Sequence, residues 1–244
     1  MKPALALSSR SEFLAGIKAE LPILLGVMPF GMIYGVLAVG AGLPVGTAQA
    51  MSVIVFAGSA QFMGVQLLRL STPGVIVVLT TFVVNLRHVL YSASIAPHLK
   101  HLNWRWKLIL AYLLTDEAYA IVITHYDQAS NERAPRRHWY FLGAGLALWS
   151  TWQVSTAIGT LLGAQIPPSW ALDFTLALTF IALVVPALDD RPSAAAAFVA
   201  GLVAVLAIGW PYKLGLMAAA ASGIAAGLLV EAWRSPTLHL RKMP

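Results

Sequence analysis

The sequence is dominated by apolar runs, each close to the roughly 20 residues that a membrane-spanning helix needs. Only 11% of the 244 residues are charged and 59% are hydrophobic, whereas a soluble domain carries about 25% charged residues. The chain is therefore predicted to be an all-α, polytopic membrane helix bundle of about eight hydrophobic segments with no separate soluble domain. The predicted segments cover residues 21–41, 47–69, 74–96, 108–126, 140–163, 171–189, 194–210 and 213–232.

The domain organisation follows from the same runs. We expect residues 1–20 to form a cytoplasmic amino-terminal segment, residues 21–232 a single transmembrane transport domain, and residues 233–244 a cytoplasmic tail. Lys and Arg gather in the segments that this topology places inside, as in cytoplasmic loops generally. The net charge of +6 is explained in this way without nucleic acid, and both termini are predicted to be cytoplasmic.

One loop does not fit this topology. Lys100, Arg105 and Lys107 lie on a connection that eight crossing segments place outside, where basic residues are depleted. An early segment can therefore be re-entrant instead of crossing.

Helix-breaking and small residues lie near the centres of several segments. Pro29 removes a backbone donor at the middle of the first, which predicts either a discontinuous helix or a simple kink. The run 56–62 in the second contains small residues that allow a helix or a ligand to approach closely. Trp149 and Trp152 lie at the middle of the fifth, away from the interfaces that tryptophan prefers, either as a cavity wall or as ordinary packing.

Ionisable residues occupy the middles of the third and fourth segments. Arg87 and His88 follow Asn85 in the third, and Asp116 and Glu117 are adjacent in the fourth. A charge at mid-membrane costs roughly 2.5–3.5 kcal/mol, so it needs a partner or a function. Because Arg87 and Asp116 lie at nearly equal separations from the intervening loop, antiparallel helices bring them to the same depth. Arg87 is therefore predicted to pair with Asp116 or Glu117.

One carboxylate is then left over, since adjacent residues point about 100° apart on a helix. A dry environment favours its protonated form, which makes it a candidate proton site. The alternative is an ion pair that only holds the hairpin together. An intramembrane hydrolase built on Ser59, His88 and Asp116 is a weaker hypothesis, because spacing alone does not define a triad.

Chemistry that needs other residues is excluded or not indicated. Without any cysteine the chain has no disulfide and no thiolate metal site. It has no P-loop motif for ATP, and no cofactor or metal is predicted. Breaks, small residues and charges at one depth are instead typical of secondary transporters with a midplane site.

Four runs in this order and spacing resemble the AzlC family of branched-chain amino-acid exporters. These are residues 29–31, 56–62, 85–92 and 115–119. Three later runs extend the resemblance over nearly the whole chain, namely residues 172–174, 180–183 and 190–192.

The resemblance implies an inner-membrane permease, and not an enzyme, that exports leucine, isoleucine, valine and also methionine, together with a small membrane subunit of the AzlD type. The alternatives are a structural or regulatory subunit and a passive channel. Candidate substrate-binding residues are Pro29, Phe30, Gly31, Phe56, Gly58, Ser59, Gln61, Phe62, Asn85, Arg87, Tyr91, Trp149 and Trp152. Candidates for proton coupling or an ion pair are Arg87, His88, Asp116 and Glu117.

Overall fold

The computed structural model describes residues 8–128, 136–163, 190–211 and 214–234, together with Val185 and Leu188. These residues form helices and their connections, with no strand among them, which confirms the predicted helix bundle. The chain divides into two units, Met1–Pro167 and Pro168–Pro244. Three described helical segments are long and apolar enough to cross a membrane: Ser9–Gly40, Gly74–Leu99 and Leu214–Trp233.

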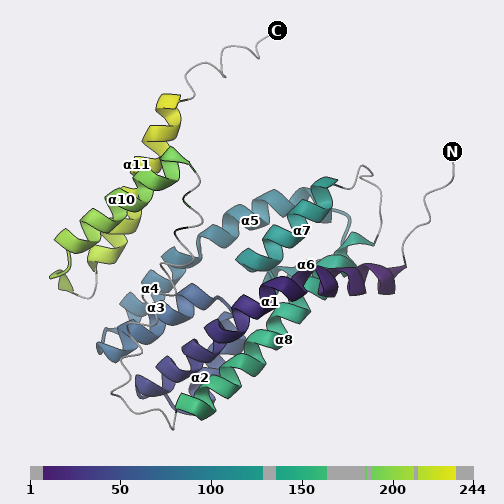
Figure 1. Cartoon of the computed structure of the whole chain (residues 1–244), viewed down its shortest axis with the longest axis horizontal. Helices are drawn as coiled ribbons and strands as arrows, with labels where there is room; N and C mark the ends of the chain where they lie inside the picture. The colour runs from purple at the N-terminus through teal and green to yellow at the C-terminus, as the bar shows by residue number, and fades with distance from the viewer. Residues whose placement is uncertain are drawn as a thin grey trace. The chain divides into compact units, whose positions relative to one another are not determined.

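Two long helices, α1 (Ser9–Gly40) and α8 (Arg137–Gly163), pack side by side in the first unit (Figure 1). Small residues allow the close approach: a Cβ at Gly35 would lie 2.5 Å from the Thr156 carbonyl oxygen, and one at Gly16 would overlap the backbone of Tyr140. Because Gly16 meets Tyr140 and Gly35 meets Thr156 further along, the two helices run parallel. The amino-terminal ends of α1 and α8 therefore lie together.

Helix α1 continues unbroken through Pro29. The hypothesis of a discontinuous first helix is thus wrong. Contacts with α8 at Gly16 and Gly35, before and after the proline, hold the helix together although one backbone hydrogen bond is missing.

The second apolar run forms two short helices instead of one. Helix α2 (Val45–Val55) ends at Phe56, whose φ of 39° is left-handed, and α3 (Gly58–Arg69) then begins. A Cβ at Gly64 of α3 would meet the Met51 side chain of α2, so α3 turns back beside α2. The ring of Phe62 packs against those of Phe30 and Tyr34. Gly58, at the start of α3, lies against the ring of Trp152 in α8.

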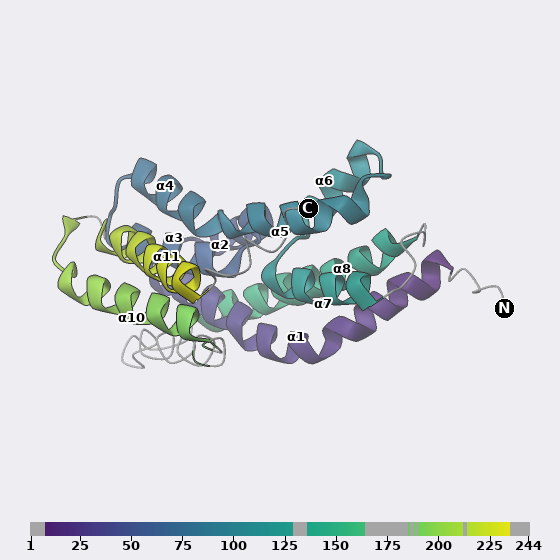
Figure 2. The same ribbon diagram turned by 90° about the horizontal axis from the view of Figure 1, so that it is seen from above.

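The third run is nearly continuous. Helices α4 (Gly74–Asn85) and α5 (Arg87–Ile95) follow one another through Leu86, and the 3-10 helix η1 (Ala96–Leu99) completes the segment (Figure 2). The Leu86 N–H donates to Val83 O and the Val89 N–H to Leu86 O, so the helix is tightened locally at this point.

The fourth run is a second hairpin, made of α6 (Trp104–Tyr112) and α7 (Asp116–Gln128). Trp106, near the start of α6, contacts the His138 ring at the beginning of α8, with ring centroids 4.6 Å apart. Tyr126, near the end of α7, donates its hydroxyl to the Arg137 carbonyl oxygen at 3.1 Å. Both ends of the segment therefore lie at the amino-terminal end of α8, and the turn at residues 113–115 lies deep in the bundle.

The two hairpins enter the first unit from opposite ends. The α2–α3 hairpin joins the carboxy-terminal end of α1 through a short loop, and α6–α7 joins the amino-terminal end of α8. Each of the runs 47–69 and 108–126 therefore begins and ends at the same end of this unit, because each is broken at its centre. This places Lys100, Arg105 and Lys107 at the same end as the start of α1, which removes the exception to the charge pattern.

The second unit contains α10 (Arg191–Leu206) and α11 (Leu214–Arg234), which pack together. Cβ atoms at Gly223 and Gly227 would lie 2.8 and 3.2 Å from side chains of Ala200 and Ala196. The small residues thus mediate helix packing, as the sequence predicts. Residues 171–184 of the predicted sixth segment, and with them the runs 172–174 and 180–183, lie outside the described residues.

Candidate functional site

The tips of the two hairpins meet at the centre of the first unit. Tyr112, at the end of α6, donates its hydroxyl to the Val53 carbonyl oxygen of α2 at 2.5 Å. Its ring lies against Phe56, with centroids 5.8 Å apart. The Trp149 indole N–H of α8 donates to the same Tyr112 oxygen at 2.7 Å. Tyr112 therefore connects the tip of the α2–α3 hairpin with Trp149 of α8.

A chain of polar side chains links the three helix breaks. Arg87, the first residue of α5, donates through Nη2 to Ser59 Oγ in the first turn of α3 at 2.5 Å. Its Nη1 lies 2.5 Å from Asp116 Oδ2, at the first residue of α7. The structure thus confirms the predicted pairing of Arg87 with the acidic pair and selects Asp116. Asp116 reaches the depth of Arg87 because α6 runs from the loop into the bundle, which places Asp116 at the tip of the hairpin.

His88 lies at the edge of this chain. Its Nε2 is 4.0 Å from Asp116 Oδ1, and its Nδ1 is 3.1 Å from the Asn85 carbonyl oxygen. Its ring packs edge-on against Tyr91. The Ser59 hydroxyl is engaged by Arg87, and no hydrogen bond joins Ser59 to His88 among the described residues. The arrangement thus differs from that of a serine hydrolase, in which the histidine must take the serine proton.

Several polar atoms at the helix breaks are buried without a hydrogen-bond partner among the described residues. They include Arg87 Nε, Asp116 Oδ1, Asn85 Oδ1 and Trp152 Nε1. The first turn of α3 also lacks a side-chain cap, because Ala57 precedes it. Buried polar groups are normally satisfied, and helix amino termini attract anions. This part of the bundle can therefore still bind a small polar molecule.

Aromatic side chains form a cluster beside the start of α3. The Tyr34 ring stacks near Trp152 at 6.2 Å and packs edge-on against Phe62, which also contacts Phe30. A Cβ at Gly58 would lie 3.1 Å from the Trp152 ring. The structure thus brings together three of the candidate substrate-binding residues, Phe30, Phe62 and Trp152, whereas Phe56 lies on Tyr112.

Three further candidate substrate-binding residues, Gln61, Gly31 and Tyr91, lie outside the polar chain and the aromatic cluster. Gln61 is fully buried, near Tyr34. Gly31 lies against α8, where a Cβ added to it would be only 2.7 Å from the Ser155 side chain, so it serves helix packing. Tyr91 stacks on Tyr119, with ring centroids 4.6 Å apart.

A polar network between α2 and α8 is absent from the sequence predictions. Gln49 Nε2 donates to Gln153 Oε1 at 2.9 Å, and Ser52 Oγ lies 3.1 Å from Thr156 Oγ1. The Tyr34 hydroxyl donates to Ala48 O at 3.0 Å. Isolated polar residues inside apolar runs are the signal that marks these positions, since such groups face a bundle interior.

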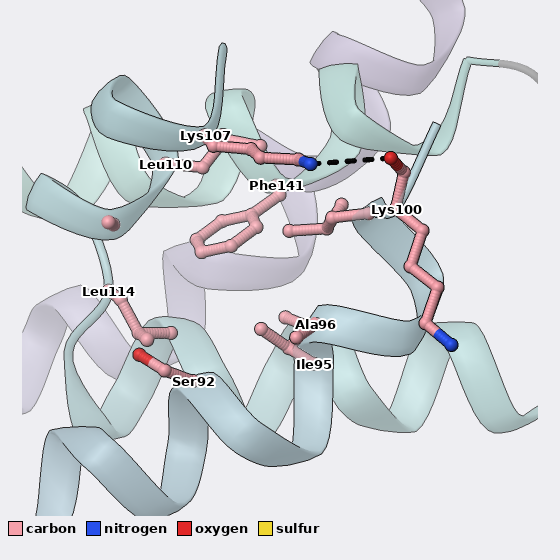
Figure 3. Close-up of a pocket in the computed structure, with 10 residues that line it drawn as sticks. Ser92, Ile95, Ala96, Lys100, Lys107, Leu110, Leu114 and Phe141 are labelled. Atoms are coloured by element: carbon pink, nitrogen blue, oxygen red, sulfur yellow. Dashed lines mark hydrogen bonds between the residues drawn. The ribbon is translucent and has the colours of Figure 1, made fainter. Parts of the chain in front are cut away.

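An apolar pocket of about 300 Å³ opens between α5, η1, α6 and α8 (Figure 3). Leu110, Leu114 and Phe141 line it, and Ser92 lies beside Leu114 at one edge of it (Figure 3). At its other side Lys107 Nζ donates to the Lys100 carbonyl oxygen at 3.3 Å. Leu114 lies in the break between α6 and α7, two residues before Asp116. The pocket thus reaches the same hairpin tip as the polar chain.

Comparison with known proteins gives a consistent result. The family model described as AzlC protein matches residues 22–166. An uncharacterized membrane protein of Archaeoglobus fulgidus is 33% identical over 76% of this chain and 80% of its own length. Inner membrane protein YgaZ of Escherichia coli is 26% identical, over 92% of this chain and 93% of its own. Branched-chain amino acid transport protein AzlC of Bacillus subtilis is 24% identical, over 73% and 70%. No solved structure matches significantly.

Proposed function

Since the chain belongs to the AzlC family of membrane transport proteins, we propose that it is a secondary transporter exporting branched-chain amino acids across the inner membrane. Leucine, isoleucine and valine are the proposed substrates, with methionine as a further one. Protons drive the export, and a small AzlD-type subunit is the proposed partner. The printed function of the Bacillus subtilis relative, branched-chain amino acid transport, supports the substrate class.

The observation that carries this proposal is the meeting of two opposed hairpin tips at the Ser59–Arg87–Asp116 chain. Discontinuous helices whose ends meet inside the bundle are the usual construction of a transporter binding site. Oppositely charged groups at one point suit a zwitterion. Arg87 and the uncapped start of α3 hold the carboxylate, and Asp116 holds the ammonium group.

The experiment measures leucine and valine efflux from cells preloaded with dipeptides that contain these amino acids. The chain is expressed alone and with its small partner, and both proteins are verified in the membrane. We expect efflux well above that of empty-vector cells when both are present, and acceleration by an inward proton gradient. Efflux at the empty-vector level would contradict the proposed substrate class, and efflux insensitive to the proton gradient would contradict the coupling.

A second prediction concerns the apolar pocket, which we propose receives the aliphatic side chain of the substrate. Ser92→Phe adds a ring to the lining of the pocket beside Leu114 and leaves both residues of the Arg87–Asp116 pair unchanged. We expect leucine efflux to fall several-fold, whereas Ser92→Ala, which adds no volume, leaves it close to wild type. Equal efflux from the two variants at equal membrane levels would exclude the pocket from the substrate path.

A further inference from the structure

Acidic residues line one face of α1 in the first unit. Glu12, Gly16 and Glu20 are spaced by four residues, so they lie on one face of the helix, and all three are buried. The Glu20 side chain is fully buried, and neither of its carboxyl oxygens has a hydrogen-bond partner among the described residues. An isolated carboxylate in such surroundings is costly. The structure offers Glu20 no donor and no cation in an ion pair within the part of the chain that it describes.

The titratable groups facing Glu20 add no positive charge. Glu117 of α7 lies close enough for the two carboxylates to repel each other. Tyr140 of α8 also interacts electrostatically with Glu20. A carboxylate is costly in an apolar environment, and a neighbouring negative charge adds to that cost. A proton bound to Glu20 removes the repulsion and the cost of burial together.

A row of titratable groups connects this pair to the end of the bundle. His125 Nε2 lies 3.5 Å from Glu12 Oε2, and the His125 ring stacks on Tyr140 with centroids 3.8 Å apart and planes 5° from parallel. Tyr140 interacts with both Glu12 and Glu20. The row therefore runs along the contact of α1, α7 and α8, from near the start of α1 to the residue beside Asp116.

We propose that Glu20, the buried carboxyl group near Glu117, is a proton-binding site that binds one proton and releases it when substrate binds. This coupling role rests on the proposed function, whereas proton binding by Glu20 does not. The ammonium group of a substrate at Asp116 stabilises a negative charge on neighbouring Glu117. The proton then leaves Glu20 towards His125 and Glu12 and passes to water at the amino-terminal end of α1. When the substrate departs, a proton returns to Glu20, which is the exchange that antiport requires.

The test compares Glu20→Gln with wild type, each purified with the small partner. Infrared difference spectra between acid and alkaline pH should show a protonated carboxyl group in wild type that is missing in Glu20→Gln. In weakly buffered solution, leucine binding should release about one proton per site from wild type and much less from the variant. Leucine binding and leucine–leucine exchange should persist in the variant, because neither needs net proton movement. Glu231→Gln, at an exposed position of α11, is the matched control and should behave as wild type.

The possible outcomes separate the inference from the proposed function. If wild type does not bind leucine, the proposed substrate class fails, and the infrared arm still decides whether Glu20 carries a proton. A carboxyl band that is unchanged in Glu20→Gln would overturn the site. Full proton release by Glu20→Gln on leucine binding would overturn its coupling role. A folded Glu20→Gln protein that exchanges leucine but exports none against a proton-driven gradient would support both.

Discussion

Asp116→Asn is expected to abolish leucine export while the chain remains in the membrane at its normal level. The substitution keeps the shape of the side chain and removes its negative charge. Arg87 then loses its negatively charged partner while its hydrogen bond to the Ser59 hydroxyl remains, and the substrate ammonium loses its counter-charge. The pair is half-buried, so removing one partner leaves the other charge uncompensated in partly desolvated surroundings. We expect efflux to fall at least about tenfold, which corresponds to about 1.4 kcal/mol, in the dipeptide-loading assay.

The matched control is Asp127→Asn, near the end of the same helix, where the side chain is exposed. It removes one acidic charge from α7 without touching the hairpin tip, and export should be unchanged. Normal export by a well-expressed Asp116→Asn protein would exclude Asp116 from the mechanism.

Charge reversal distinguishes a transport role from a purely structural one. Arg87→Asp and Asp116→Arg each place two like charges at the tip, so each alone should lower the membrane level. Combined, they restore an ion pair with its orientation reversed. We expect the membrane level to recover without export, because the substrate would meet each charge at the wrong end. Recovery of export as well would show that the pair only holds the hairpins together.

Gly35→Ala is expected to disrupt the packing of α1 on α8. The added Cβ would lie 2.5 Å from the Thr156 carbonyl oxygen and 2.6 Å from the Thr160 backbone nitrogen. Neither backbone atom can rotate away, so the helices must separate locally. Overpacking of this kind costs about 1–3 kcal/mol, and the melting temperature of the purified protein in detergent should fall clearly.

Gly26→Ala provides the control on the same helix. Nothing lies within 4 Å of the position that its Cβ would take. Because alanine favours the helix over glycine by about 0.5–1 kcal/mol, this variant should be as stable as wild type or more so. If both variants melt at the same temperature, the contact at Gly35 does not hold the two helices together.

The sequence predicts the helical class, because this depends on the composition of the apolar runs. It also predicts the Arg87–Asp116 pair, because the two residues lie at nearly equal separations from the loop between their segments. It does not predict the two hairpins. An apolar run folded back at its centre has the same length and hydropathy as one that crosses. The break at Phe56 requires a left-handed φ at a residue other than glycine, which tertiary packing must impose. The basic residues at 100, 105 and 107 were the available sign of re-entry.

Glu20 shows a second limit of sequence analysis. It lies at the boundary of the predicted first segment, where an acidic residue is expected to face water. Helix α1 instead begins at Ser9, before the apolar run, and carries the side chain into the bundle. Only the contacts with α7 and α8 reveal that this carboxyl group is buried.

The opposed entry of the two hairpins has a consequence for how such a protein can move. Helices α1 and α8 are held together by backbone contacts at glycines. Withdrawal of α6–α7 would expose the central charges from the end where α1 begins, and withdrawal of α2–α3 would expose them from the other. In the transporter that we propose, each hairpin would then be the gate for one side of the membrane, and the substrate would change sides while the long helices stay in place.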